Sequence, residues 1–317
     1  MTDTHPAALV LDAAAVDALL HRVDTLGAMR SLFSELGKGK AVQPPQTLTL
    51  FPEDHGDFIT YLGASTGAGV FGAKLSPYLV QPGKPVVTAW TILMSMETGQ
   101  PLMLCDSGVL TTERTAGTTA LALDHLVRPE AKVLSIIGSG NVARAHLRHV
   151  LNLRNWEEVR VYSPGIQVDT LRQVEWTDLD ARVQIVVDAE AAGDSADAVM
   201  LCTSSGTPVF DPSALAAGAV VTSISTNVAD AHEIAPDFLS MAEVYCDYRA
   251  TTPLAAGEMK LAAAAGWDPT DIRGDLAALE VGAAPAPSGE KPVFFRSIGL
   301  GLEDIFMARA IYDAARS

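Results

Sequence analysis

Three small residues, Gly138, Gly140 and Ala143, stand at the spacing of a phosphate-binding turn. An apolar run over residues 133–137 precedes the turn, and a helical pattern begins at Asn141. Glycine permits a tight turn and a close backbone approach, and the new helix directs its free N–H groups at an anion. The pattern therefore predicts a strand, a turn and a helix that hold the pyrophosphate of a dinucleotide. The predicted cofactor contacts here are Gly138, Ser139, Gly140, Asn141, Val142, Ala143 and Arg144.

The next apolar run indicates which dinucleotide binds. It ends at Tyr162-Ser163 without the Asp or Glu that NAD-specific folds place at this tip to hold the ribose hydroxyls. Ser163 can donate a hydrogen bond to a 2′-phosphate, and Arg144 can supply charge, so the sequence favours NADP(H) over NAD(H). Alternatively, Ser163 only caps a turn and the acid comes from elsewhere. Thr203 and Ser204 follow a later apolar run and are expected to face the cofactor cleft.

Two cations stand at unusual places. Arg114 lies near the start of a predicted helix over residues 112–127, where a positive charge opposes the helix dipole. Lys74 lies inside an apolar, extended stretch. An Arg beside free helical N–H groups suits a carboxylate, and a pocket Lys can bind a carboxylate or deliver a proton. The plainer alternatives are an exposed Arg114 paired with Glu113 or Asp106, and a Lys74 at a sheet edge.

The remaining polar residues carry weaker signals. His146 falls on an apolar helical stripe and is expected to be a core histidine. The adjacent pairs Asp54-His55 and His232-Glu233 are interpreted as surface or loop residues. Ser204-Ser205-Gly206 lacks the G-x-S-x-G pattern of a nucleophile elbow, so a serine hydrolase is not supported.

Composition narrows the class of protein. The 317 residues are 48% hydrophobic and carry 22 basic against 38 acidic residues, a net charge of -16, which argues against a broad nucleic-acid-binding face. No apolar run reaches the roughly 18 residues of a membrane span, and we expect no signal peptide. The three widely spaced cysteines indicate reduced thiols in a cytoplasmic protein and lack the spacing of a metal site.

The elements that position these residues suggest two domains. From residue 127 to 296, apolar runs separated by helices or loops predict one doubly wound, Rossmann-like parallel sheet, with six candidate strands at residues 133–137, 159–162, 183–187, 198–202, 219–224 and 244–246. Residues 1–126 differ. They show helical spacing over 9–36, then extended stretches, then an antiparallel hairpin around residues 98–101, which predicts an α+β domain.

Several ordered blocks together resemble the ornithine cyclodeaminase/mu-crystallin family. The strongest covers residues 97–146, with support from residues 71–75, 221–234 and 293–305. The resemblance implies a homodimer in which the first domain, residues 1–126 together with 297–317, binds substrate and dimerises, and its C-terminal helix is predicted over residues 302–315. Family members include a cyclodeaminase that uses bound NAD, NAD(P)H-dependent imino-acid reductases, amino-acid dehydrogenases and lens crystallins.

Carried over by position, Lys74 and Arg114 match the family's carboxylate-binding Lys and Arg. A further Arg of the family is Gln46 here, which can hydrogen-bond a carboxylate but gives no charge. The resemblance also implies Ser297 as a substrate-binding residue. The essential Asp of the cyclodeaminase aligns with Asn227, which cannot act as a carboxylate base, and Asp230 could replace it only in a rearranged loop.

These residues favour an NAD(P)H-dependent oxidoreductase of an α-imino or α-amino acid. Arg114 and Lys74 would bind the carboxylate with help from Gln46, while Lys74 or a water near Asn227 would move the proton. The alternatives are an ammonia lyase of the ornithine cyclodeaminase type with bound NAD, and a non-enzymatic, crystallin-like NADPH-binding protein. The substrate is expected to be a small molecule, with no nucleic-acid or membrane partner.

Overall fold

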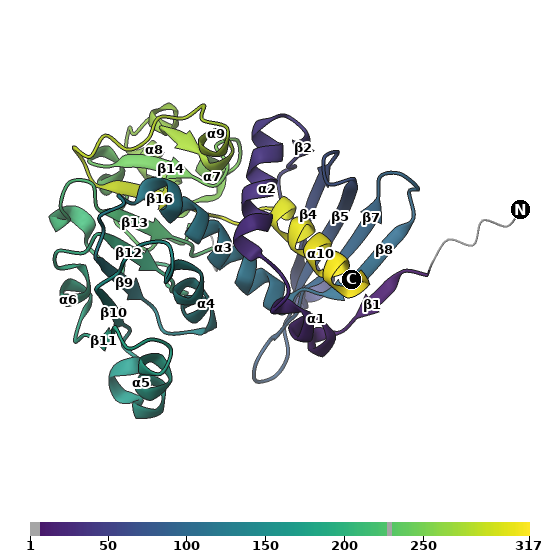
Figure 1. Ribbon diagram of the computed structural model, residues 1–317, viewed down its shortest axis with the longest axis horizontal. Helices are drawn as coiled ribbons and strands as arrows, with labels where there is room; N and C mark the ends of the chain where they lie inside the picture. The colour runs from purple at the N-terminus through teal and green to yellow at the C-terminus, as the bar shows by residue number, and fades with distance from the viewer. Residues whose placement is uncertain (1–6, 227–229) are drawn as a thin grey trace, which may run out of the picture. The chain divides into compact units, whose positions relative to one another are not determined.

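The computed structural model describes residues 7–226 and 230–317 and divides into two compact units (Figure 1). Unit 1 contains Met1–Arg114 and Leu300–Ser317, and unit 2 contains Thr115–Gly299. The sequence places the first boundary at residue 126 instead. Both positions lie on helix α3, Gly108–Leu126, which begins in unit 1 and continues into unit 2.

Unit 1 is built on a mixed sheet with the strand order β1-β8-β7-β5-β4-β2, to which β3 and β6 add by pairing with β4 and β5. The strands are β1 (Leu9–Leu11), β2 (Ala41–Val42), β3 (Thr47–Leu50), β4 (Gly56–Ser65), β5 (Val70–Leu79), β6 (Val86–Val87), β7 (Trp90–Ser95) and β8 (Pro101–Asp106). β1 runs parallel to β8, and the other pairs are antiparallel. The expected hairpin is therefore β7 and β8.

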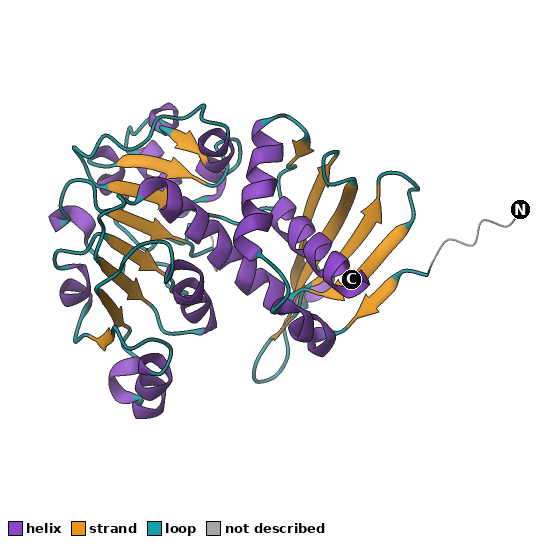
Figure 2. Ribbon diagram, viewed as in Figure 1, coloured by secondary structure: helices purple, strands orange, loops and turns teal. Residues whose placement is uncertain are grey.

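Helix α10 (Gly301–Arg316) lies against β4, β5 and α2 (Thr25–Gly37) in unit 1 (Figures 1 and 2). Glycines permit its close approach to the sheet. A Cβ on Gly63 would lie 3.0 Å from a Leu302 methyl carbon, and one on Gly72 would lie 2.8 Å from an Ile305 methyl carbon. The C-terminal helix thus returns to the first domain, as the family resemblance implies.

The prediction of helical structure throughout residues 9–36 is wrong in two places. Leu9–Leu11 forms β1, because its residues pair with β8 instead of continuing into a helix. The helical part is interrupted between α1 (Ala13–Leu20) and α2, where the Asp24 carboxylate accepts a hydrogen bond from Gly27 N at 2.9 Å and caps α2. An apolar stripe at helical spacing does not reveal such a break, whereas an N-cap Asp does.

Unit 2 contains an all-parallel sheet with the order β11-β10-β9-β12-β13-β16-β14-β15. The strands are β9 (Val133–Ile137), β10 (Glu158–Tyr162), β11 (Val183–Ile185), β12 (Ala198–Leu201), β13 (Val220–Ser223), β14 (Glu243–Cys246), β15 (Gly274–Asp275) and β16 (Val293–Arg296). The helices are α4 (Asn141–Val150), α5 (Thr170–Thr177), α6 (Ala189–Gly193), α7 (Thr252–Ala255), α8 (Gly257–Ala264) and α9 (Leu276–Glu280). Short 3₁₀ turns are η1 (Pro52–Asp54) in unit 1, and η2 (Ile166–Val168), η3 (Pro212–Ala214), η4 (Pro236–Ser240) and η5 (Pro269–Asp271) in unit 2.

All six predicted strands of unit 2 are present, and their parallel pairing confirms the Rossmann-like fold class. The sequence did not anticipate β15 and β16. β16 comes last in the chain but inserts between β13 and β14, so its neighbours cannot be inferred from chain order. Within the described part of the chain, no helix is long and apolar enough to span a membrane.

Candidate active site

The glycine turn at the end of β9 has the geometry that the sequence predicts. Gly138 adopts a φ of +126°, and a Cβ there would lie 2.3 Å from the carbonyl oxygen of Cys202, so only glycine fits. Gly140 is the N-cap of α4, and a Cβ on it would meet nothing within 4 Å. The first turn of α4 is therefore open to a close approach by a phosphate, and these residues fit a dinucleotide.

Two serines lie side by side next to this turn. The Oγ atoms of Ser139 and Ser163 are 2.6 Å apart, and both side chains are buried. Ser163 also accepts a hydrogen bond from Ile166 N at 3.2 Å, so it does cap a turn. Arg144 binds Glu175 at 2.7 Å and Asn141 Oδ1 at 2.7 Å. The structure thus brings Ser139, Ser163 and the start of α4 together.

A buried carboxylate, Glu233, organises the neighbouring loops; it lies in a loop, as the sequence suggests, but not on the surface. Glu233 is fully buried. Its Oε1 accepts hydrogen bonds from N and Oγ1 of Thr203, at 2.9 and 2.7 Å. Its Oε2 accepts from Ser223 Oγ, Ile224 N and Ser225 N, at 2.8, 2.9 and 3.1 Å. Glu233 therefore joins the segments that follow β12 and β13. The only sequence signal was its position between residues that pack in the core, Ala231 and Ile234.

In unit 1, Lys74 and Arg114 meet in one buried cluster of charges. Lys74 lies on β5, between β4 and β7, and is 1% exposed, so the sheet-edge alternative is wrong. Its Nζ lies 2.9 Å from Asp304 Oδ1, 3.4 Å from Thr111 Oγ1 and 4.0 Å from the centre of the Tyr61 ring. Arg114 is 6% exposed and donates from Nη1 to Glu303 Oε2 at 2.8 Å.

The salt-bridge partners of Arg114 are different acids from Glu113 and Asp106, the two that the sequence suggested. Its salt bridges join it to Glu303 and, from Nε to Oδ1 at 3.4 Å, to Asp304. Both acids stand in the first turn of α10, where negative charge is favoured by the helix dipole, and both are buried. Sequence reasoning missed them, although two acids inside the apolar run at residues 298–307 were a signal that they have buried partners.

Burial and charge set the protonation of this cluster. Burial lowers the pKa of the Lys74 ammonium to about 8, even though the Asp304 carboxylate opposes the shift. Burial also opposes the charge of Arg114, but the Asp304 and Glu303 carboxylates outweigh it and raise the pKa of the guanidinium. Lys74 can therefore exchange a proton near neutral pH, while Arg114 stays cationic.

The remaining predicted residues occupy other places. Gln46 is partly buried just before β3. Gln43, which the sequence analysis did not single out, is buried and accepts a hydrogen bond from Leu302 N at 2.9 Å, at the start of α10. Ser297, in unit 2, donates to Asp247 Oδ2 at 3.1 Å. Asn227 lies outside the described residues.

The structure also places Asp230, the alternative catalytic acid, and the residues that were expected in the core. Asp230 has a φ of +58° and pairs with Lys260 on α8. His146 is fully buried, with Nε2 3.0 Å from Thr119 Oγ1, which confirms the interpretation of a core histidine. Cys105, Cys202 and Cys246 are buried free thiols. In the part of the chain that the structure describes, no group of His, Cys, Asp and Glu could hold a metal ion.

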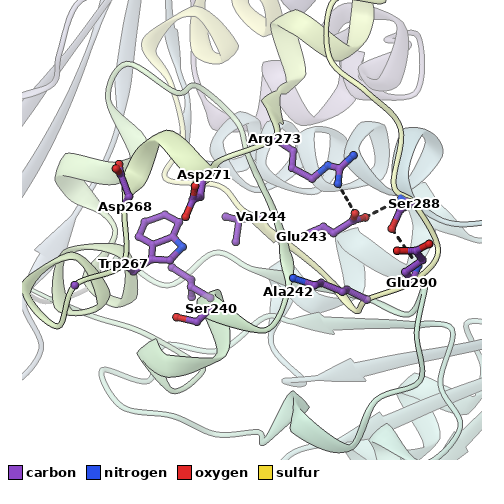
Figure 3. A pocket seen from close by; sticks show the side chains of 13 residues that line it. Ser240, Ala242, Glu243, Val244, Trp267, Asp268, Asp271, Arg273, Ser288 and Glu290 are labelled. Atoms are coloured by element: carbon purple, nitrogen blue, oxygen red, sulfur yellow. Dashed lines mark hydrogen bonds and ion pairs between the residues drawn. The ribbon is translucent and has the colours of Figure 1, made fainter.

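A depression of about 600 Å³ lies in unit 2 at the amino end of β14 (Figure 3). Glu243 in its wall accepts hydrogen bonds from Arg273 Nη1 at 2.5 Å and Ser288 N at 2.8 Å (Figure 3). None of the predicted site residues lines it. Ligands of doubly wound sheets bind at the carboxyl ends of strands, where Gly138 and Thr203 lie, so this depression is separate from the cofactor site.

The Rossmann-like unit with its glycine turn is typical of dinucleotide-binding proteins. The model of the ornithine cyclodeaminase/mu-crystallin family matches residues 7–317. The chain is 52% identical over 305 residues to the NAD(P)H-dependent anabolic L-arginine dehydrogenase DauB of Pseudomonas aeruginosa, covering 96% of each protein. The chain belongs to the ornithine cyclodeaminase/mu-crystallin family.

Two solved structures share the fold. The Δ1-pyrroline-2-carboxylate reductase of Thermococcus litoralis, in complex with NADH and L-proline, matches with a TM-score of 0.88 at 24% identity and covers 97% of each chain. An archaeal alanine dehydrogenase dimer with bound NAD matches with a TM-score of 0.88 at 24% identity, covering 98% of this chain and 96% of its own.

Proposed function

We propose that this enzyme interconverts L-arginine, or a closely related basic amino acid, and its 2-imino acid. The chain is an NAD(P)H-dependent oxidoreductase of amino or imino acids. The observation that carries the narrower proposal is the 52% identity to an L-arginine dehydrogenase over 96% of both chains. A substrate of this kind has a carboxylate at one end and a cation at the other, so it needs a cationic site for the first.

The cluster around Lys74 and Arg114 is our candidate for that cationic site. Lys74 and Arg114 would bind the substrate carboxylate, with Gln46 as an uncharged assistant. Lys74, whose pKa is about 8, would also give up or take up the proton that the imine and amine exchange. A bound nicotinamide supplies or accepts the hydride, and the residues of the chain hold the reacting carbon in line with it.

For the cofactor we propose NADP(H) as the favoured partner. The tip of β10 presents the hydroxyl of Ser163 beside that of Ser139, with no carboxylate at residues 161–164 to repel a 2′-phosphate. The relative from Pseudomonas aeruginosa carries NAD(P)H in its name, so a preference and not strict selectivity is expected.

We further propose that the enzyme is a cytoplasmic homodimer. Alternate residues of the unit 1 sheet point away from α10 and leave an exposed apolar face, composed of Val10, Leu62, Phe71, Leu75, Trp90, Ile92 and Leu104. Replacing Leu75 and Ile92 together by Lys should give monomers in size-exclusion chromatography with light scattering. Val168→Lys, an exposed change in unit 2 that lies outside this face, should leave the dimer intact. The buried free thiols suit a reducing compartment.

A substrate panel tests the proposed reaction. NADPH and NADH oxidation is followed with ammonia and the 2-oxo acids of arginine, lysine, ornithine and alanine, and with cyclic imines. The reverse reaction is followed with the corresponding amino acids. The highest kcat/KM should belong to the arginine pair. Turnover of cyclic imines or alanine without L-arginine would overturn the substrate assignment. Ammonia release from L-ornithine without net cofactor change would identify a cyclodeaminase instead, and tight NADPH binding without any turnover would identify a crystallin-like protein.

A further inference from the structure

We propose that Asp304 and Glu303 are positioning residues of the carboxylate site, with separate tasks. Asp304 holds Lys74 in place and keeps it cationic, and Glu303 fixes the guanidinium of Arg114. This inference rests on the proposed function, because it assigns Lys74 and Arg114 to the substrate carboxylate. In this proposal the C-terminal helix α10, which carries both acids, sets the charge of the site.

The two acids contact the cations differently. Both oxygens of Asp304 lie 2.9 Å from Lys74 Nζ, and Oδ1 also lies 3.4 Å from Arg114 Nε. Glu303 reaches Arg114 Nη1 at 2.8 Å. Both acids have fully buried side chains, so water screens these pairs little. Charge pairs in such surroundings fix side-chain geometry more firmly than exposed pairs do.

A hydrogen bond to a side chain and a close backbone contact hold the first turn of α10 in place. Gln43 accepts a hydrogen bond from Leu302 N, directly before the two acids. Gly301 stands so close to β4 that a Cβ on it would lie 2.3 Å from the Leu62 carbonyl oxygen. Glu303 and Asp304 therefore lie on a helix end that is held in place by these contacts.

Lys74 and Arg114 together balance the charges of Asp304 and Glu303. Lys74 faces Asp304 and Glu303 from α10, Arg114 and Thr111 from α3, and Tyr61 from β4. Two cations and two carboxylates sum to zero, and a substrate carboxylate adds one negative charge. The site should therefore bind that carboxylate more weakly once Lys74 loses its proton, because Arg114 is then the one cation left of the pair. Burial lowers the pKa of Lys74 to about 8, and Asp304 acts against burial.

The two acids should therefore give different mutant phenotypes. Asp304→Asn removes the charge that raises the pKa of Lys74, and a lost opposite charge at this distance should lower that pKa by about 1–3 units. Glu303→Gln acts on Arg114, which does not titrate in the assay range. It should raise KM roughly tenfold or more and move the pH profile less than Asp304→Asn does, because the Glu303 charge raises the pKa of Lys74 less than the Asp304 charge does.

A direct measurement of the lysine tests the first task independently of turnover. The chain has seven lysines, so [13Cε]lysine labelling gives a simple spectrum, and Lys74→Arg identifies the Lys74 signal by its loss. In the ligand-free wild type this signal should titrate near pH 8, and in Asp304→Asn it should titrate 1–3 units lower. An unchanged titration in Asp304→Asn overturns the role of Asp304, whatever the enzyme turns over.

The pH dependence of KM for the best substrate of the panel is then compared among variants. KM should rise above pH 8 in the wild type and at correspondingly lower pH in Asp304→Asn. A common pH profile for Asp304→Asn and Glu303→Gln would contradict the separate tasks. If no substrate is turned over while the Lys74 titration shifts as expected, the proposed function has failed and the charge-setting role of Asp304 stands.

Two control variants separate charge from packing. Asp313→Asn makes the same change further along α10, at an exposed pair with Arg309, and should leave both the profile and the melting temperature unchanged. Asp304→Glu keeps the charge, so its lysine should titrate with that of the wild type. If the Lys74 titration shifted as far in Asp304→Glu as in Asp304→Asn, packing and not charge would set the pKa of Lys74. If Asp304→Asn does not fold, Asp304→Glu decides alone: a Lys74 signal that titrates well below that of the wild type, although the charge is kept, overturns the charge-setting role of Asp304.

Discussion

The Glu233 carboxylate gives a sharp prediction, because five donors converge on it. Glu233→Gln keeps the size of the side chain but turns one acceptor oxygen into an NH₂ donor. The less harmful orientation places the NH₂ at the Oε1 position, opposite Thr203, where the hydroxyl can rotate to accept. The backbone N–H of Thr203 cannot rotate, so it loses its acceptor and faces another donor.

The magnitude follows from these contacts. An unsatisfied buried N–H costs about 1–3 kcal/mol, and the three remaining bonds to Ser223, Ile224 and Ser225 lose the strengthening that a charged acceptor gives, about 1–2 kcal/mol in total. The sum, about 2–5 kcal/mol, corresponds to a decrease of roughly 5–20 °C in the melting temperature of a domain the size of unit 2.

The assay is thermal unfolding followed by circular dichroism, with NADPH affinity measured by fluorescence titration. Residues 203–205 lie beside the glycine turn, because β12 pairs with β9 up to Leu201 and Ile137, so NADPH should also bind more weakly. Glu157→Gln, an exposed pair with Lys132, is the matched control and should change stability by less than about 1 kcal/mol. A melting temperature within 2 °C of the wild type, together with unchanged NADPH affinity, would refute the reasoning.

Three further changes test the site. Gly138→Ala should abolish measurable NADPH binding in fluorescence titration, because its Cβ would overlap the Cys202 carbonyl oxygen, and wild-type affinity would contradict the turn geometry. Arg114→Ala should lower kcat/KM roughly 100-fold or more, since it leaves buried acids without their cation, and full activity would remove the role assigned to it. Ser163→Asp should shift the NADPH/NADH ratio of kcat/KM toward NADH by tenfold or more, and an unchanged ratio would place the 2′-phosphate elsewhere.

Local patterns were sufficient to predict the conformation of the glycine turn. A β-rich run, two glycines and a helix start are adjacent in the chain, and their chemistry depends on backbone conformation alone, so Gly138 and Gly140 could be located from sequence. The same holds for His146, whose place on an apolar stripe indicates burial. The parallel sheet follows from apolar runs separated by helices.

The partners of the cationic residues could not be predicted in this way. Asp304 stands 230 positions after Lys74, and only the packing of α10 on β5 brings them together. Glu233 does lie in a loop, but its burial could not be predicted, because its donors are hydroxyls and backbone N–H groups from segments that no local pattern connects to it. The position of β16 between β13 and β14 is likewise a property of the folded sheet.

In the reaction we propose, the enzyme moves a hydride between NAD(P)H and the imine of a basic amino acid. The most direct test of this claim is the initial rate of NADPH oxidation with ammonia and the 2-oxo acid of arginine, measured together with NADP⁺ reduction by L-arginine. We predict saturable turnover in both directions, with a kcat/KM higher than for the alanine pair and for cyclic imines. No cofactor oxidation with the arginine pair, under conditions in which NADPH binds, would contradict the claim.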